Sequence, residues 1–406
     1  MLGGRGKALG VLHALGRSAI LFLSFFVFLI LGIPIGICLG LSSICAILYS
    51  GTSLTIVATN MYSGISKFLL LAIPFFVLSG NIMAKAGISR RLIDFVDTCV
   101  GHKKGGIAIV CVIVSCFFGA ISGSGPATVA ALGAVLIPAM VEQGGFSAPF
   151  STALMATANS VAIVIPPSIA FVVYASITGV SIADMFMAGI VPGILMGVAL
   201  VIVVILEANK HDIKPSRQKA SAKERWATFK DAFWGFLMPV IILGGIYGGY
   251  VTPTEAAVLS VLYALIYGFA TKEIKVKVLW TVLSKTVLTS AVVTFIISVA
   301  KTFGWILSKT RLPAIIGEAI MEVIPNKWVY LAGLMALLFL VGCLMDTIPS
   351  ILILAPILVP VGVQFGLDEL HLGVLFCITL TVGFITPPFG INLFTDRKST
   401  RLNSSH

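Results

Sequence analysis

One carboxylate of the sequence lies where a charge is costly. Asp346 stands between two apolar runs, at residues 328–344 and 347–363. A charged side chain at the centre of a bilayer costs about 2.5–3.5 kcal/mol on insertion scales, so such a residue is a candidate functional group. Two roles fit it equally well: its oxygens contact a cation, or its side chain orders the turn by capping the helix that begins near Thr347.

Small polar residues occupy a similar turn earlier in the chain. Ser122, Gly123 and Ser124 lie between the apolar runs 105–121 and 126–141. They suit either a tight turn with close helix packing or a cation and substrate site. Met345 and Thr347 flank Asp346 in the later turn. Further candidates precede two proline pairs: Asn159 lies mid-helix a few residues before Pro166, and Thr379, Thr381, Gly383 and Thr386 lie in the comparable stretch before Pro387. Asn159 either cross-links helices or offers its side-chain carbonyl to a cation, and we favour the second role.

The two turns belong to an internal repeat. Residues 122–171 resemble residues 344–392, and Pro138 matches Pro360 at an offset of 222. At an offset of 221 the repeat also matches two helix-breaking pairs, Pro166-Pro167 and Pro387-Pro388. Each copy then reads as a helix–turn–helix hairpin followed by a broken helix. Within a membrane such breaks are tolerated only where they line a cavity or are buried in protein, and there freed carbonyls can coordinate Na⁺.

Composition determines the class of protein that must position these residues. The chain has 406 residues, of which 58% are hydrophobic and 11% charged, whereas a soluble domain is about a quarter charged. A soluble enzyme, a disordered chain and a disulfide scaffold are excluded. At ~20 residues per crossing, the apolar residues suffice for roughly ten crossings. No Walker or HExxH motif occurs and the five His are scattered, so we expect no ATPase, no transition-metal site and no enzyme.

Basic residues predict the topology. The net charge of +11 would suggest nucleic acid in a soluble protein, but here it lies in loops beside apolar runs, so we expect a lipid bilayer and no nucleic acid. The positive-inside rule places four basic segments in the cytoplasm: the N-terminus, 85–104, 207–230 and 272–285. The opposite side then holds 50–67, 166–183, 251–254 and 309–327. On this path the two copies of the repeat are inverted.

Three further segments have specific interpretations. Thr252 to Glu255 reads as a capping box with proline at the first helical position. Segments 88–100 and 310–324 look amphipathic and predict helices along the membrane surface. Lys301 lies inside an apolar run, where it either faces a carboxylate substrate or extends to the interface, and we favour the second.

The sequence divides into six regions. Its last eleven residues read, codon for codon, like the translation of a common sequencing adapter, so we expect that the natural chain continues with at least one more helix. The expected regions are a basic N-terminal segment that need not be the natural start (1–18), scaffold helices (19–104), the first repeat with its hairpin (105–206), a cytoplasmic loop with scaffold helices (207–286), a truncated second repeat with its hairpin (287–395) and the adapter-like tail (396–406).

Together these features resemble the large membrane subunit of tripartite ATP-independent periplasmic (TRAP) transporters of the C4-dicarboxylate type. The resemblance covers nearly all of residues 19–395. Its most specific stretches are FFGAISGSGPATVAALGAVLIPAM (117–140), ATANSVAIVIPPSIAF (156–171), YGGYVTPTEAA (247–257), GCLMDTIPSILILAPILVP (342–360) and GFITPPFGINLF (383–394).

The resemblance implies an all-α, inverted-repeat, elevator-type ion-transporter fold with two re-entrant hairpins and broken helices in a bacterial inner membrane. It also implies Na⁺-coupled import of an acidic organic solute, such as a C4-dicarboxylate or a sugar acid. A periplasmic substrate-binding protein would deliver the solute, and a small four-helix membrane subunit would complete the complex. Two alternatives remain: a stand-alone Na⁺-coupled anion symporter of related fold, and a non-transporting assembly factor or intramembrane enzyme.

Overall fold

The computed structural model describes residues 2–386 except 124 and 325, and for 2–15, 126, 127 and 130 it describes only the backbone. The described chain is mostly helical. The first half contains α1 (Leu2–Ile30), α2 (Ile35–Tyr49), α3 (Thr55–Ile65), the short 3₁₀ helix η1 (Phe68–Leu71), α4 (Ala72–Lys85), α5 (Ile88–Val100), α6 (Gly106–Ser122), α7 (Gly125–Glu142), α8 (Ala148–Val164) and α9 (Ile169–Thr178). The second half contains α10 (Ile182–Lys210), α11 (Ala222–Tyr247), α12 (Pro253–Ala270), α13 (Val276–Lys309), α14 (Leu312–Val323), α15 (Lys327–Leu344), α16 (Thr347–Gln364) and α17 (Glu369–Gly383). Of the described helices, seven are long and apolar enough to cross a membrane, or eight where the bent pair α8–α9 is counted as one span.

Ion pairs gather three of the basic segments at one end of the helices, which we call the basic end. Three contacts connect them: Lys104 with Asp212 at 2.9 Å, Arg217 with Asp97 at 2.9 Å and Arg91 with Glu273 at 3.4 Å. Segments 50–67, 251–254 and 309–327 lie at the opposite end, where the ammonium group of Lys67 donates to the carbonyl of Ser176 and Thr254 approaches the Phe68 carbonyl at 3.5 Å. Of the expected segment 166–183 only the later part lies there, because Pro167 lies against the tip of the first hairpin. The grouping of these loops agrees with the predicted topology.

The N-terminal segment does not follow that topology, and the expectation that it joins the basic end is wrong. Ser18 donates to Thr310 at 3.2 Å, and Thr310 lies at the opposite end. The apolar run 19–49 is interrupted at Gly32 (φ 78°) and Pro34, so the proline caps a new helix instead of continuing the first. The apolar run is thereby divided into 19–30 and 35–49, each shorter than the ~20 residues of one crossing, and α1–α2 forms a hairpin whose turn reaches the middle of α13 beside Phe295.

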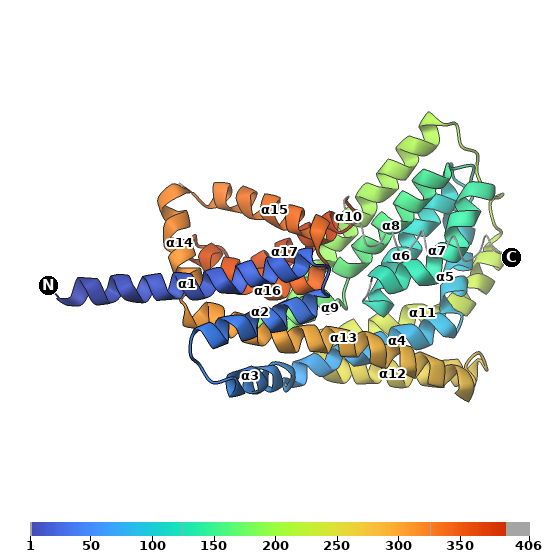
Figure 1. Ribbon diagram of the computed structural model, residues 1–406. Helices are drawn as coiled ribbons and strands as arrows, with labels where there is room; N and C mark the ends of the chain where they lie inside the picture. The colour runs from blue at the N-terminus through green and yellow to red at the C-terminus, as the bar shows by residue number, and fades with distance from the viewer. Residues whose placement is uncertain (1, 124, 325, 387–406) are drawn as a thin grey trace.

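The repeat takes the form that the sequence predicts. Hairpins α6–α7 and α15–α16 lie on opposite sides of the molecule, and their closed ends point towards its middle (Figure 1). Each hairpin packs against the helix that follows it, α8 or α17, and these two helices pack against each other. We call α6–α9 and α15–α17 the repeat helices, and α1–α5 with α11–α13 the scaffold helices. This grouping differs from the expected one, in which the second repeat begins at residue 287, inside α13.

Matching glycine contacts confirm the repeat at the level of single residues. A Cβ on Gly119 of α6 would lie 2.2 Å from the Cβ of Ala162 on α8, and a Cβ on Gly383 of α17 would lie 2.8 Å from the backbone of Gly342 on α15. Gly342 follows Gly119 by 223 positions and Gly383 follows Ala162 by 221. In both copies the first hairpin arm therefore comes into close contact with the helix that follows the hairpin, α8 or α17.

Local sequence explains how several elements begin. Thr252 and Glu255 form the predicted capping box at α12, with Thr252 N–H donating to the Glu255 carboxylate at 2.7 Å. The predicted amphipathic segments are α5 and α14. The first broken helix divides at Pro166-Pro167, a cis peptide bond, and its two parts are bent by 40°.

Candidate functional site

The tip of the first hairpin lies against the break in the first repeat. α6 ends at the buried Ser122, whose hydroxyl shares a 2.8 Å hydrogen bond with that of Thr128. Gly123 adopts φ 60°, a conformation that favours glycine, and a Cβ there would lie 3.0 Å from the carbonyl oxygen of Pro167. The structure therefore brings the predicted tip and the predicted Pro-Pro break together. Ser124, another predicted site residue, lies outside the described residues.

Asn159 joins this group from α8. A Cβ on Gly125 would lie 3.1 Å from the Asn159 carbonyl oxygen, so the tip rests on the helix at Asn159. The Asn159 side chain is fully buried, and its amide nitrogen donates to the Met155 carbonyl within the same helix. Its oxygen, Oδ1, is buried without a hydrogen-bond partner. The amide is thus oriented by its nitrogen, and its oxygen is free to accept.

The second hairpin places Asp346 at its tip without using its carboxylate as a cap. Asp346 has the backbone geometry of an N-cap residue for α16 (φ −63°, ψ 153°), but its side chain makes no capping hydrogen bond. Ser350 instead donates to the Asp346 main-chain carbonyl at 2.8 Å. The residue as a whole is exposed, but its carboxylate is buried and lies close to the backbone N–H groups of Thr347 and Ile348, so both proposed roles, cation contact and ordering of the tip, stay open. The adjacent Met345 is half-buried.

The predicted residues in α17 and just beyond its end occupy two environments. Thr379 and Thr381 are buried, and Gly383 touches the end of α15 close to the second tip. Thr386 is half-buried and its hydroxyl donates to the Val382 carbonyl at 3.1 Å. Of these residues, Gly383 has a packing role and Thr386 satisfies its own hydroxyl. The predicted break at Pro387-Pro388 lies outside the described residues.

Three of these residues present buried oxygens that nothing in the described chain satisfies. Nine buried side-chain polar atoms lack a hydrogen-bond partner there, and the three that belong to predicted site residues are Asn159 Oδ1, Thr347 Oγ1 and Thr381 Oγ1. A buried polar atom without a partner costs about 1–3 kcal/mol, so each such atom requires an explanation. Oxygens of this type are the ligands that hard cations prefer. No group of three or more His, Cys, Asp or Glu side chains suited to a transition metal occurs in the part of the chain that was described.

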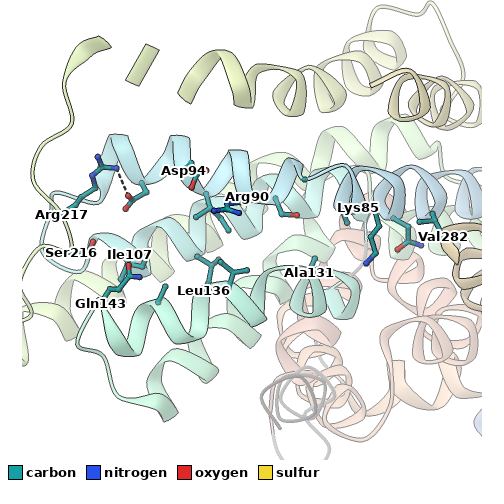
Figure 2. A pocket seen from close by; sticks show the side chains of 18 of the residues that line it. Lys85, Arg90, Asp94, Ile107, Ala131, Leu136, Gln143, Ser216, Arg217 and Val282 are labelled. Carbon is teal, nitrogen blue, oxygen red and sulfur yellow. Dashed lines mark hydrogen bonds and ion pairs between the residues drawn. The ribbon is translucent and has the colours of Figure 1, made fainter. Parts of the chain in front are cut away.

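Two cavities separate the scaffold helices from the repeat helices. The inner cavity, at the basic end, has a volume of about 920 Å³ and lies between α4, α5 and α13 on one side and α7 on the other. Figure 2 shows Lys85 and Ala131 near one end of it, Arg90 and Asp94 in the middle and Arg217 at the other end. The outer cavity, at the opposite end, has a volume of about 240 Å³ and lies between α3, α9, α13 and α16.

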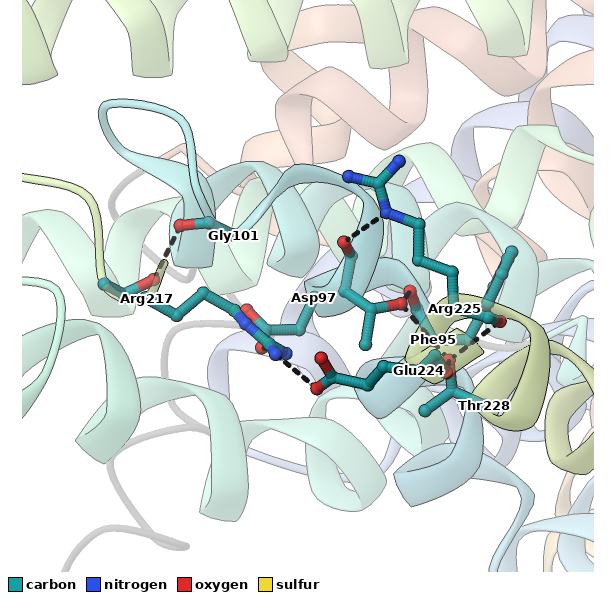
Figure 3. A network of polar contacts seen from close by, with 9 residues as sticks. Phe95, Asp97, Gly101, Arg217, Glu224, Arg225 and Thr228 are labelled. Carbon is teal, nitrogen blue, oxygen red and sulfur yellow. Dashed lines mark hydrogen bonds and ion pairs between the residues drawn. The ribbon is translucent and has the colours of Figure 1, made fainter. Parts of the chain in front are cut away.

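A polar network closes one end of the inner cavity. Arg217, in the loop before α11, donates to Asp97 at 2.9 Å and to Glu224 at 2.5 Å (Figure 3). Ser216 donates to the Gly101 carbonyl at 3.1 Å, and Arg225 donates to the Thr98 carbonyl at 3.2 Å. The network fastens the long basic loop to α5, and its carboxylates raise the pKa of the Arg217 guanidinium.

Sequence reasoning missed some residues of this region. Thr128, six residues beyond Ser122, holds the first tip through its hydroxyl, and its only signal was a polar residue in an apolar run. Lys67, Lys85 and Lys285 line the two cavities, although the sequence suggested only loop positions for them. Lys301, expected to extend to the interface, also lines the outer cavity.

An inverted pair of hairpins, each packed on a following helix and ending near unsatisfied oxygens, defines a membrane permease of the secondary-transporter class. The family model described as "Tripartite ATP-independent periplasmic transporter, DctM component" matches residues 22–402. The chain belongs to this family of TRAP large permease subunits, which are transporter subunits and not enzymes. It is a multi-pass protein of the bacterial inner membrane.

Curated relatives agree with this assignment. The chain is 39% identical over 358 residues to a C4-dicarboxylate TRAP transporter large permease protein of Pseudomonas aeruginosa. The aligned region covers 88% of this chain and 83% of the relative. It is 40% identical over 377 residues to an isethionate TRAP transporter permease protein of Oleidesulfovibrio alaskensis, covering 92% of this chain but 59% of the relative. The 2,3-diketo-L-gulonate TRAP transporter large permease protein of Escherichia coli is 35% identical, with 87% and 85% covered.

A solved structure shares the fold. The YdaH transporter of Alcanivorax borkumensis, whose topology is described as unusual, matches with a TM-score of 0.56 at 13% identity, over 86% of this chain and 81% of that one. This likeness shows a shared fold and nothing finer.

Proposed function

We propose that this chain is the membrane permease of a Na⁺-driven importer of acidic organic solutes. A periplasmic binding protein delivers the solute, and a small four-helix membrane subunit completes the complex. The curated relatives are named for C4-dicarboxylate, isethionate and 2,3-diketo-L-gulonate, all of them organic acids. The observation that carries the proposal is the set of buried, unpartnered oxygens near the two hairpins.

Na⁺ suits these oxygens because it is a hard cation that takes neutral and anionic oxygen ligands. Asn159, whose Oδ1 lacks a partner, contacts the first tip through its main-chain oxygen, and Thr347 Oγ1 and the Asp346 carboxylate belong to the second tip. A bound cation would satisfy oxygens that otherwise destabilise the fold. An acidic solute placed between the tips would gain from the same positive charge, which couples the two binding events.

We further propose that the repeat helices move as one body against the scaffold. The inner cavity is the larger of the two, which is the arrangement expected when the binding site opens to the basic, cytoplasmic end. Close backbone contacts such as Gly119 with Ala162 make the hairpins move together with α8 and α17.

Reconstitution tests this function directly. The permease, a small subunit and a binding protein of a TRAP system would be assembled in proteoliposomes, and uptake of radiolabelled succinate, isethionate and diketogulonate measured under an inward Na⁺ gradient. We expect uptake of at least one acid to require Na⁺ and the binding protein. Na⁺-dependent uptake without either partner would indicate a stand-alone symporter. Absence of flux with every acid and every cation gradient would contradict the transport proposal.

The substitution Thr381→Val tests whether Thr381 is an ion ligand or only a packing residue. Valine keeps the shape of threonine and removes a buried hydroxyl that has no partner. We expect Thr381→Val to raise stability without Na⁺ by about 1 kcal/mol and to raise the Na⁺ concentration for half-maximal uptake about tenfold. Thermal unfolding with and without Na⁺ measures the first effect.

The matched control is Thr178→Val in α9, whose hydroxyl donates to the Tyr174 carbonyl at 3.0 Å. This control should lower stability slightly and leave the Na⁺ dependence unchanged. A Thr381→Val protein with unaltered Na⁺ dependence would remove Thr381 from the ion site.

A further inference from the structure

The scaffold carries two lysine pairs along the adjacent helices α4 and α13, one pair in each cavity. α4 and α13 pack antiparallel, and Asn81 of α4 donates to Thr286 of α13 at 3.0 Å. Lys85 ends α4 one turn beyond Asn81, and Lys285 precedes Thr286 in α13. These two lysines line the inner cavity.

The other pair lies in the outer cavity. Lys67 directly precedes η1, which leads into α4, and Lys301 lies 16 residues beyond Lys285 in α13, about 24 Å along the helix at 1.5 Å per residue. Both line the outer cavity. A Cβ on Gly64 of α3 would lie only 2.9 Å from the Cβ of Lys301, so the absence of a side chain at Gly64 leaves room for the lysine stem.

These charges are poorly neutralised by the protein. In the part of the chain that the structure describes, Lys67, Lys85, Lys285 and Lys301 take part in none of the ion pairs. Lys67 donates to the main-chain carbonyl of Ser176, which is neutral. Burial lowers the pKa of the Lys67 ammonium, and the positive charge of Lys301 lowers it further.

The acidic residues nearby do not balance the lysines. The described lining of the outer cavity contains no carboxylate. The inner cavity has four basic residues against two acidic ones. Of the acidic pair, Asp97 is engaged by Arg217. Burial raises the pKa of Asp94, and the charge of Arg90 partly offsets this. Each cavity is therefore left with an excess of about two positive charges.

The two cavities have corresponding places in the two copies of the repeat. Ala131 and Val135, on the second arm of hairpin 1, line the inner cavity, and Leu352 and Pro356, on the second arm of hairpin 2, line the outer one. Each cavity therefore lies along the second arm of one hairpin, the arm that leads away from the tip. A solute leaving the tips towards either end would pass a lysine pair.

We propose that Lys67 with Lys301 and Lys85 with Lys285 form two anion-binding stations on the scaffold, one before and one after the hairpin site on the path of the solute. Each pair attracts a small organic acid with two anionic groups more strongly than one with a single group, because two separated ammonium groups face the same cavity. The proposal rests on the proposed function only for the direction of travel. The charge of the cavities is independent of it.

Thiol chemistry tests the two stations without any need for transport. Ser308→Cys reports on the outer cavity and Ala131→Cys on the inner one, since both residues line them. Each thiol in the full chain, in nanodiscs with the small subunit, would react with the anionic reagent methanethiosulfonate ethylsulfonate and with its cationic trimethylammonium analogue. Rates would be corrected for the native thiols in the parent chain.

We expect the anionic reagent to react about tenfold faster relative to the cationic one, since a focused potential raises local anion concentration by about 10- to 1,000-fold. The double variant Lys67→Gln with Lys301→Gln should abolish the preference for the anionic reagent at position 308 and leave it intact at position 131. The double variant Lys85→Gln with Lys285→Gln should abolish that preference at position 131 and leave it intact at position 308. The corresponding arginine pairs should retain it. Lys277→Gln on α13, which lines neither cavity, is the matched control.

Protection by succinate, compared with propionate at equal ionic strength, tests the preference for two anionic groups. We expect succinate to slow both labelling reactions at concentrations that leave propionate without effect, and the glutamine pairs to lose this protection. An unchanged reagent ratio in the glutamine pairs, or equal protection by both acids, would overturn the proposal. Labelling that follows the expectation in a complex without Na⁺-driven uptake would keep the stations and reject the proposed function.

Discussion

Replacing Asp346 by alanine is expected to lower Na⁺-dependent uptake about 100-fold while leaving the protein folded. The Asp346 side chain at the second tip makes no capping hydrogen bond to α16, and its nearest polar partners are the backbone N–H groups of Thr347 and Ile348, so its loss affects the tip locally and leaves the helix packing intact. A charge-assisted contact is worth about 1.5–3 kcal/mol, and each 1.4 kcal/mol is a tenfold change. Asp346→Asn, which keeps the shape but not the charge, should share the defect.

Asp368 is the matched control, because it is a true N-cap. Its carboxylate accepts from Leu370 N–H at 2.9 Å and from His371 N–H at 3.0 Å at the start of α17. Asp368→Ala should cost about 0.5–2 kcal/mol of stability and leave the Na⁺ dependence intact. Asp346→Ala should therefore lower Na⁺-dependent uptake and leave thermal unfolding unchanged, whereas Asp368→Ala should lower thermal stability and leave the Na⁺ dependence unchanged. Wild-type uptake kinetics in Asp346→Ala would show that the residue only orders the tip.

The hairpins could be predicted because their signals are local and repeated. A turn of small or polar residues between two apolar arms, and prolines at matching offsets, specify helix ends through backbone geometry alone. Pro166-Pro167 divides α8 from α9 where the sequence indicated. The capping box at Thr252 and Glu255 likewise depends on residues only three positions apart.

The N-terminal hairpin could not be placed from charge and length together. The run 19–49 is long enough for one crossing, and the basic residues before it suggested a cytoplasmic start. Gly32 and Pro34 divide it into arms of insufficient length. The break was visible in the sequence, but only packing against α13 and contact with Thr310 decide on which side the hairpin stays.

The lysine pairs show a second limit of sequence reasoning. Lys67 and Lys301 are 234 positions apart, and only the antiparallel packing of α4 against α13 brings them to one cavity. Lys301 alone fits the interface as well as a cavity, because its long stem can extend in either direction. Gly64 leaves space for that stem, but this role can be inferred only once α3 is known to lie against α13.

Gly342→Ala is expected to be among the most destabilising small changes in the chain. A Cβ at Gly342 on α15 would lie 2.6 Å from the Leu380 carbonyl oxygen and 3.1 Å from the Cα of Gly383. Both neighbours are backbone atoms of α17, so no side-chain rotation relieves the overlap and the hairpin must separate from the helix. Overpacking of this kind costs about 1–3 kcal/mol, and we expect a lower melting temperature and loss of uptake together.

Gly333→Ala on the same helix provides the control, because a Cβ there meets nothing within 4 Å. It should leave the melting temperature unchanged or raise it, since alanine favours a helix more than glycine does. Fluorescence-detected size-exclusion chromatography after heating compares the two variants at small scale. Equal melting temperatures for Gly342→Ala and Gly333→Ala would mean that hairpin 2 does not depend on its backbone contact with α17. Because the same contact recurs at Gly119 and Ala162, Gly119→Ala should then be tolerated as well.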